Sequence, residues 1–130
     1  MIDQSTICAI STPPGVGGIA VIRLSGSKAV AITEEVFTSP NQDKKLAEQS
    51  ANTLHFGTIR NGEKIVDEVV VSLFRAPHSF TGEDVVEISC HGSQYIQQAI
   101  LELLLSKGAR MAGPGEFTQR AFLSGKMDLS

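Results

Sequence analysis

Glu87 is the residue whose position most calls for a chemical explanation, because its carboxylate lies inside an apolar segment. Val86 and Ile88 flank it, and the β-branched residues around it are typical of a strand. Burying an unpaired carboxylate costs free energy, so Glu87 must face either water or a partner. A carboxylate accepts two adjacent N–H groups side by side, as an aminopyrimidinone ring offers them. Alternation places Glu87 beside Val85 and Ser89 on the more polar strand face, which leaves exposure to solvent as the alternative.

Two cations elsewhere in the chain are candidates for binding an anionic ligand. Arg23 lies in a second strand-like segment, where a guanidinium can bind a carboxylate or phosphate through paired hydrogen bonds. The alternative for Arg23 is a sheet edge, with the stem packed and the charged group in water. Lys126 directly follows Gly125, a residue that suits the end of a helix, and taken alone it is typical of a solvated surface.

The remaining titratable residues form no catalytic pattern. Glu83 and Asp84, together with Glu87, are one conceivable acid–base set for hydrolysis, but acids in a turn are usually solvated. His91 is a conceivable base, although a single histidine is more often structural. The chain has no G-x-S-x-G segment and no order of Ser, His and Asp that marks a triad.

Residues 12–18, TPPGVGG, form a glycine-rich loop that invites comparison with phosphate-binding loops. Phosphate-binding loops lead into a helix whose N-terminus faces the anion, whereas this loop leads into a strand-like segment. The chain also lacks a G-x-x-x-x-G-K-[ST] motif. We therefore expect a connection between two strands, with room for a ligand to come close to it.

The order of periodic segments predicts the fold class. Strands alternate with helices and include an antiparallel hairpin, so we expect an α/β (α+β) domain: a mixed sheet with about three packed helices. The predicted strands cover residues 6–11, 19–25, 54–60, 65–74, 85–90 and 109–112. Helical spacing follows Ser27 and Ser93, which are suitable N-caps. Residues 113–117 form a tight turn into a third helix that carries Phe117, Ala121 and Phe122.

Two local sequence signals predict the hairpin and its return strand. Asn61-Gly62 suits a type I′ turn, which needs two residues at positive φ. The return strand, residues 65–74, is apolar on both faces, which is typical of a central strand covered on both sides.

The overall composition is that of an ordinary globular protein. Of 130 residues 42% are apolar and 19% are charged, which fits one domain, residues 1–130. The net charge of −3 argues against a free-standing nucleic-acid binder. No apolar run approaches the roughly 18 residues of a membrane span, and the N-terminus lacks a signal-peptide pattern, so we expect a cytoplasmic protein with no membrane partner. Cys8 and Cys90 are too few for a disulfide framework or a zinc site, and we expect two reduced, partly buried thiols.

Three segments, in this order, give the chain a specific resemblance. They are TPPGVGGIAVIRLSG (12–26), HSFTGEDVVEISCHG (78–92) and GPGEFTQRAFLSGKMDLS (113–130). Together they resemble the N-terminal domain of the family of tRNA-modifying GTPases called MnmE or TrmE. The resemblance spans residues 6–130, with a loose middle at 38–50. Asp128 has the position of a further helix cap, and we expect a helical domain and a GTPase domain to follow.

The resemblance implies a fold related to folate-binding aminomethyltransferases and a bound tetrahydrofolate derivative such as 5-formyltetrahydrofolate. In the family's pattern the folate contacts fall on Arg23, Glu87 and Lys126, and all three residue types are present. No catalytic residue and no metal ligand are implied within this segment. Val16 stands in the glycine loop where some relatives carry a basic residue, which removes a possible extra charge near the ligand.

The resemblance also implies partners for the protein. In the family this domain forms a homodimer. The full protein acts with the flavin-dependent protein MnmG (GidA) and installs an aminomethyl-type group at the wobble uridine of certain tRNAs. The one-carbon unit comes from a folate. GTP, Mg²⁺ and K⁺ belong to the GTPase domain, so GTP hydrolysis is expected of the full protein and not of this segment.

Two functions of other classes stay open at this point. A stand-alone folate enzyme of the aminomethyltransferase type would need a longer chain and a catalytic acid outside these motifs. A pure interaction module would use the glycine loop and the hairpin for assembly only, and it would bind no folate.

Overall fold

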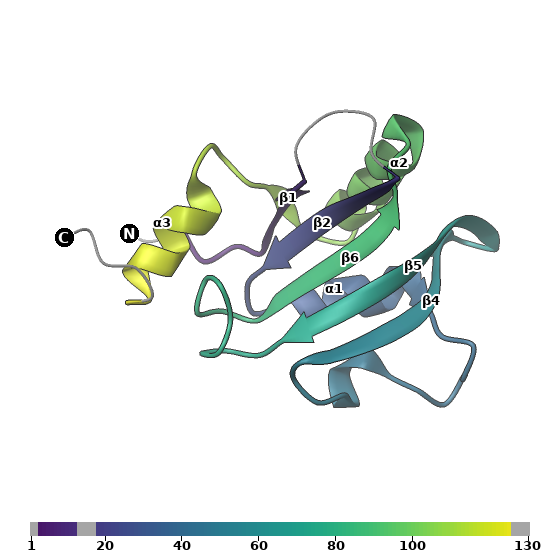
Figure 1. Cartoon of the computed structure of the whole chain (residues 1–130), viewed down its shortest axis with the longest axis horizontal. Coiled ribbons are helices and arrows are strands. Elements are labelled where there is room, and N and C mark those ends of the chain that lie inside the picture. Colours follow the sequence, from purple (N-terminus) through teal and green to yellow (C-terminus); the bar gives the residue numbers. More distant parts are fainter. Residues whose placement is uncertain (1–2, 13–17, 126–130) are drawn as a thin grey trace.

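The computed structural model describes residues 3–12 and 18–125. These residues form one mixed sheet of seven strands and three α-helices, which confirms the expected fold class (Figure 1). In chain order the elements are β1 (Ile7–Ile10), β2 (Ile19–Ser25), α1 (Ala29–Val36), β3 (Phe37–Thr38), the 3₁₀ turn η1 (Leu46–Glu48), β4 (Thr53–Asn61), β5 (Lys64–Phe74), β6 (Val85–His91), α2 (Gln94–Ser106), β7 (Arg110–Met111) and α3 (Glu116–Leu123).

The sheet places two distant parts of the chain side by side at its centre. The strand order is β3-β4-β5-β6-β2-β1-β7, and every neighbouring pair is antiparallel except β1 and β7, which are parallel. β2 and β6 are therefore inner neighbours although some 60 residues separate them. Their register sets Arg23 directly opposite Glu87.

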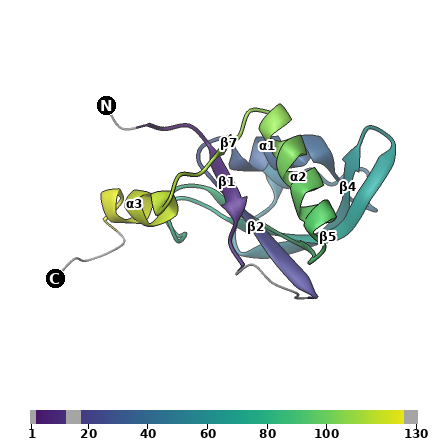
Figure 2. The same ribbon diagram turned by 90° about the horizontal axis from the view of Figure 1, so that it is seen from above.

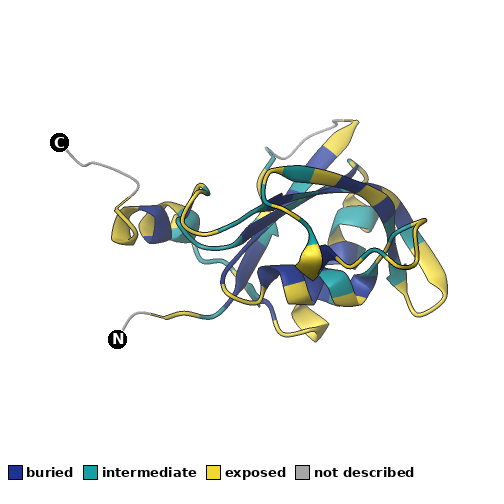
Figure 3. Ribbon diagram, turned by 90° about the horizontal axis from the view of Figure 1, so that it is seen from below, coloured by how far each residue is buried: buried dark blue, intermediate teal, exposed yellow. Residues whose placement is uncertain are grey.

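The core lies between one face of the sheet and the helices α1 and α2, which pack on the same side (Figure 2). Alternate residues of the inner strands point into it, among them Ile22, Val71 and Ile88, each 0% exposed. β5 is a central strand, as its sequence predicts, but the expectation that it is covered on both sides is wrong. Val70 and Ser72 alternate with buried neighbours, so they face away from α1 and α2, and they are only half-buried. The strands in Figure 3 change repeatedly between buried and less buried residues along their length.

The start of α1 differs from the prediction, because Ser27 is not its N-cap. Lys28 holds the cap position, and its backbone N–H donates to Thr6 Oγ1 at 3.1 Å. Gly26 allows this arrangement with a φ of +143°, and a Cβ at Gly26 would lie 2.5 Å from the same hydroxyl oxygen. A hydroxyl from the segment before β1 therefore replaces the local cap that the sequence suggested.

The β4–β5 hairpin is confirmed, but its turn is not the predicted one. Asn61 pairs with Lys64, so the two turn residues are Gly62 and Glu63. Of the two, Gly62 has positive φ, at +62°, and Glu63 does not. The type I′ turn expected at Asn61-Gly62 is therefore wrong. The strand register also shifts between Ile59 and its neighbour Arg60, which marks a bulge near the hairpin end.

Both of the other helices have the ends that the sequence predicts. Ser93 caps α2 by accepting a hydrogen bond from the backbone N–H of Ile96 at 3.3 Å. Gly108 follows α2 with a φ of +111°, and Gly125 follows α3 with a φ of +76°. Within residues 3–12 and 18–125, no helix is both long enough and apolar enough to cross a membrane.

Candidate functional site

Arg23 and Glu87 form an ion pair on the sheet face opposite α1 and α2. Arg23 Nε and Nη2 lie 2.9 Å and 2.8 Å from Glu87 Oε2, and each side chain is about a quarter exposed. Arg23 therefore does not lie at a sheet edge with its charged group in water. Glu87 does have a partner, as its mid-strand position suggested, and in this structure that partner is Arg23. Both arginine contacts use Oε2, while Oε1 accepts no hydrogen bond from the described residues.

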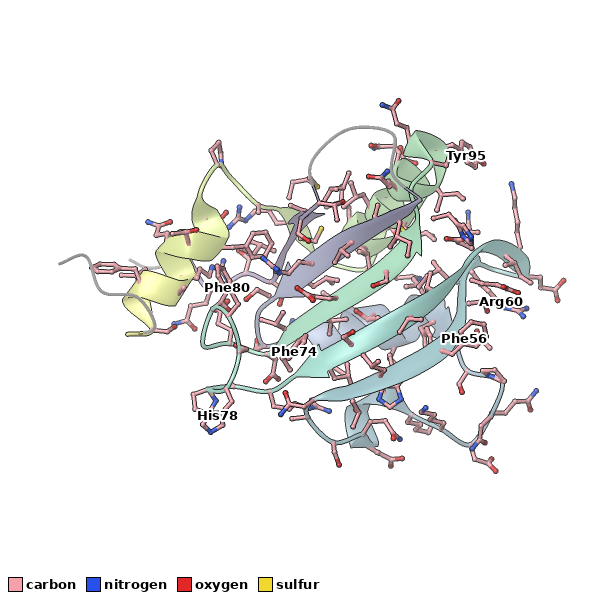
Figure 4. The ribbon with its side chains drawn as sticks, in the orientation of Figure 1. Phe56, Arg60, Phe74, His78, Phe80 and Tyr95 are labelled. Carbon is pink, nitrogen blue, oxygen red and sulfur yellow. The ribbon has the colours of Figure 1, made fainter. Side chains whose placement is uncertain are left out.

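Two phenyl rings flank the Arg23 guanidinium. Its central carbon lies 5.0 Å from the ring centroid of Phe80 and 5.7 Å from that of Phe117. Both distances are within the range of a cation–π interaction. Phe80 belongs to the turn before β6 and lies on the side of α3 (Figure 4), while Phe117 is in the first turn of α3. Arg23 is thus held by groups from three separate segments.

A cavity of about 470 Å³ opens beside Arg23. It is lined by the end of β1, Arg23, Phe80 and residues 112–118 of the turn into α3. Its volume lies within the roughly 300–1,000 Å³ of small-molecule sites. Glu87 does not line the cavity, but it contacts Arg23, which does. The arrangement offers a flat ligand aromatic walls, one guanidinium and, next to it, one carboxylate.

The turn that forms one wall of the cavity is held by Glu116. Its carboxylate accepts two hydrogen bonds from the Arg110 guanidinium, at 3.0 Å and 2.6 Å, and a third from the backbone N–H of Gly113 at 2.8 Å. The bond from Arg110 is the main reason that the pKa of Glu116 falls to about 2. Glu116 is therefore ionised at neutral pH, and it acts here as an anchor for the turn.

Glu83 and Asp84 are half-buried, and each accepts hydrogen bonds from the protein, so they are not simply solvated turn acids as expected. Glu83 accepts hydrogen bonds from Arg120 Nη1 at 3.1 Å and from Ser25 Oγ at 2.6 Å. Asp84 Oδ1 accepts the backbone N–H of Ala76 at 2.9 Å. Each carboxylate holds the turn that carries Phe80, and nothing here pairs them as an acid and a base.

His91 and the cysteines also have structural surroundings. Buried Asp67 accepts both the backbone N–H of His91, at 2.8 Å, and its ring Nδ1, at 2.7 Å. Cys8 and Cys90 are buried, and burial raises the pKa of each thiol to about 11. Two protonated, inaccessible thiols suit neither a nucleophile nor a metal site. Among the residues described, no three His, Cys, Asp or Glu side chains are grouped to hold a metal ion.

Comparison with known proteins decides the family. Residues 6–126 match the family model described as GTP-binding protein TrmE N-terminus. The chain belongs to this family. It is 60% identical over 128 residues to a protein of Bacteroides fragilis named tRNA modification GTPase MnmE, covering 98% of this chain and 27% of that protein. Proteins of the same name from Parabacteroides distasonis and Enterococcus faecalis are 61% and 54% identical, covering 98% of this chain and 28% of each relative. The chain thus spans about a quarter of the length of the curated relatives it matches.

The TrmE N-terminal fold brings together two of the three residues that the sequence predicted for the site. Arg23 and Glu87 are in direct contact. Lys126 lies outside the described residues, as do Val16 and Asp128. α3 ends at Leu123, and the described chain stops at Gly125, the residue before Lys126.

Sequence reasoning missed the residues that build the surroundings of the pair. Phe80, Phe117 and Arg120 all contact a site charge or one of its anchors. Their segments were singled out, but only for turn and helix signals. The composition held a signal: the chain has 6 Phe and no Trp, and three of these Phe, namely Phe80, Phe117 and Phe122, stand in the segments that carry the family resemblance. Spacing alone gives no reason to bring them to Arg23.

Proposed function

We propose that this chain is the folate-binding and homodimerising domain of a GTPase that modifies the wobble uridine of tRNA. The ligand is a tetrahydrofolate derivative such as 5-formyltetrahydrofolate, which serves as the source of a one-carbon unit. The observation that carries the proposal is the contact between Arg23 and Glu87 beside a cavity of about 470 Å³. Membership of the TrmE N-terminal family supports it, because the folate contacts implied by the family resemblance fall on Arg23 and Glu87.

The geometry suits the nitrogen-rich ring of a folate. Glu87 has one oxygen, Oε1, that takes no donor from the described residues, while Oε2 accepts a hydrogen bond from Arg23 Nε and lies 2.8 Å from Nη2 in the ion pair. A pterin offers adjacent N–H groups, and a carboxylate binds such a pair through both of its oxygens. For that mode Arg23 has to release its hydrogen bond to Oε2. Arg23 then turns toward a carbonyl or carboxylate oxygen of the ligand.

The aromatic residues give the cavity a second property that suits a flat ligand. Phe80 and Phe117 flank Arg23, and both line the cavity. Aromatic rings pack against a planar ligand over a large area, and the apolar contact adds affinity without restricting the ligand's hydrogen bonds. The polar pair therefore provides selectivity for the pterin, and the rings provide contact area.

Titration calorimetry with 5-formyltetrahydrofolate tests the proposal directly. Glu87→Gln keeps the size of the side chain but replaces one acceptor oxygen by a donor. A hydrogen bond to a charged group contributes about 1.5–3 kcal/mol, so Kd should rise about ten- to a hundredfold.

The matched control is Glu68→Gln, which removes the same charge from the same sheet face. Glu68 is exposed on β5 and does not line the cavity beside Arg23. We expect its folate affinity to equal that of the unchanged chain. Equal affinity of Glu87→Gln and the unchanged chain would refute the role of Glu87.

The homodimer is proposed to form through the sheet face that α1 and α2 leave uncovered. This face carries three apolar side chains with high exposure: Ile19 at 69%, Leu54 at 71% and Phe56 at 57%. Ile19 and Phe56 also line a shallow cavity of about 210 Å³ on β2, β4, β5 and β6. A second copy that covers this apolar strip would also cover the Arg23–Glu87 pair, because both lie on the same face.

The functions of the rest of the protein are proposed from the names of the relatives. Those proteins are named tRNA modification GTPases, so GTP hydrolysis is proposed for the full-length protein. Mg²⁺ and K⁺ are its proposed cofactors from the family resemblance. tRNA and a flavin-dependent protein of the MnmG (GidA) type are the proposed partners, and the cytoplasm is the proposed location. A GTPase assay on the full-length protein, with and without K⁺, tests this part. No hydrolysis in either buffer would contradict it.

A further inference from the structure

α3 is attached to the domain mainly by charged side chains. It lies beyond the end of the sheet, apart from α1 and α2 (Figures 1 and 2). Of its eight residues, only Arg120 and Ala121 are buried. A short helix that buries one methyl group gains little from apolar packing. Its position must therefore depend strongly on the contacts of Arg120.

Arg120 connects α3 to the centre of the sheet. Its side chain is only 6% exposed, and it contacts Glu83 Oε1 and Oε2 at 3.1 Å and 3.2 Å and Glu116 Oε2 at 3.3 Å. Glu83 in turn accepts the Ser25 hydroxyl at 2.6 Å. Ser25 stands two residues after Arg23 on β2, so both side chains point to the same face. The contacts thus run from the strand of Arg23, through Glu83, to α3.

The same helix carries one wall of the folate cavity. Phe117 precedes Arg120 by three residues, a spacing that places both on neighbouring positions of the helix surface. The Phe117 ring lies 5.7 Å from the Arg23 guanidinium. Glu116 anchors the first turn of α3 through Arg110, and Arg120 anchors the following turn through Glu83. If Arg120 releases Glu83, then α3 keeps only the anchor at its first residue, and the distance between Phe117 and Arg23 is no longer fixed.

We propose that Arg120 is a positioning residue of the folate site. Through Glu83 and Glu116 it holds α3 so that Phe117 closes the cavity against Arg23. This inference rests on the proposed function and adds a residue that does not line the cavity. Arg120 contributes to folate affinity without touching the ligand, because it fixes the wall that does.

A ligand-free measurement tests the positioning by itself. The Arg23 Nε–H resonance in ¹H–¹⁵N NMR spectra senses the ring currents of Phe80 and Phe117. We expect Arg120→Gln and the milder Glu83→Gln to shift this resonance in the direction that Phe117→Leu shifts it. An unchanged Arg23 resonance in both polar variants would overturn the inference, whatever the chain binds.

A double-mutant cycle in folate affinity supplies the second test. Arg120→Gln should raise the Kd for 5-formyltetrahydrofolate at least tenfold in the unchanged chain and less than twofold in the Phe117→Leu background. Arg75→Gln is the matched control, because Arg75 Nη2 donates to the carbonyls of Leu46, Ala47 and Gln49 and lies outside the cavity lining. It should leave Kd unchanged even if it lowers the melting temperature.

The outcomes separate the two proposals. If the unchanged chain binds no folate but the Arg23 resonance shifts as expected, the proposed function fails and the positioning of α3 stands. If the chain binds folate and the fold-changes in Kd caused by Arg120→Gln and Phe117→Leu simply multiply in the double variant, then Arg120 does not act through Phe117. The inference then fails while the proposed function stands.

Discussion

Phe56 offers the most direct test of the proposed dimer, because its exposure in the single chain sets the size of the effect. It is 57% exposed on β4, on the sheet face that α1 and α2 leave uncovered (Figure 4). An aromatic side chain buries about 200 Å² when fully covered, so about 110 Å² of Phe56 remains for a partner to cover. At about 25 cal/mol per Å², that area corresponds to about 2.8 kcal/mol for each protomer.

The symmetry of a homodimer doubles this free energy. In a two-fold interface the same patch is used by both copies, so complete burial of both Phe56 rings would contribute about 5–6 kcal/mol. We assume that the dimer covers half of the exposed area of each Phe56 ring. Phe56→Ser should then weaken the dimer by about 2.7 kcal/mol, a rise of about a hundredfold in Kd.

Sedimentation equilibrium over a range of protein concentrations measures this change. Tyr95→Ser is the matched control, because Tyr95 is an aromatic residue with 71% exposure on α2, outside the proposed interface. Its dimer constant should stay the same, and urea unfolding should show that both variants keep the stability of the folded chain. An equal dimer constant for Phe56→Ser and the unchanged chain would show that another surface forms the dimer.

Two predictions concern the stability of the fold. Gly57→Ala should destabilise the domain by about 1–3 kcal/mol in urea unfolding, because the new Cβ would lie 2.4 Å from the backbone oxygen of Thr38; unchanged stability would mean that β3 moves freely. Because of His55, the free energy of unfolding should fall as the pH drops below neutral. Its pKa is lowered mainly by burial, and then by Lys44, so the folded state favours the neutral ring. Stability is therefore full above the unfolded pKa of about 6.5 and is lost as pH falls from there toward the lower folded pKa. His55→Leu should remove that component from the difference between unfolding curves at two pH values, and an identical pH dependence in this variant would contradict the reasoning.

Local patterns predicted most of the secondary structure, because the signals for strands and helix ends are local. β2 begins and ends where its apolar residues predict, and Ser93 caps α2. The failures occurred where a distant residue replaced a local partner. Thr6 takes the place of Ser27 at the start of α1, and no periodicity within α1 reveals it. The open face of β5 was missed for a related reason, since apolar residues on both faces do not say what covers each face.

The charged residues of the candidate site could be predicted from the sequence, but the residues that surround them could not. Glu87 stood out because a carboxylate in a strand needs a partner, and a family pattern singled out Arg23. That the two contact each other depends on the antiparallel register of β2 with β6, which the sequence does not specify. Arg120 and Glu83 are 37 residues apart, in a helix and a turn, and their ion pair follows only from the placement of α3.

The charges around the cavity give a reason to expect a further cation at this site. Arg23, Arg110 and Arg120 form ion pairs with four carboxylates, those of Glu87, Glu116, Glu83 and Asp3. The negative charges of this set outnumber the positive ones, so it creates no net attraction for the carboxylates of a folate tail. Folate binding therefore needs positive charge from outside the pairs. Lys126, which the family resemblance assigns to the folate contacts, lies outside the described residues, and we propose that it supplies one such charge. In this proposal Glu87 selects the ring, Arg120 fixes the wall of the cavity, and Lys126 attracts the anionic tail.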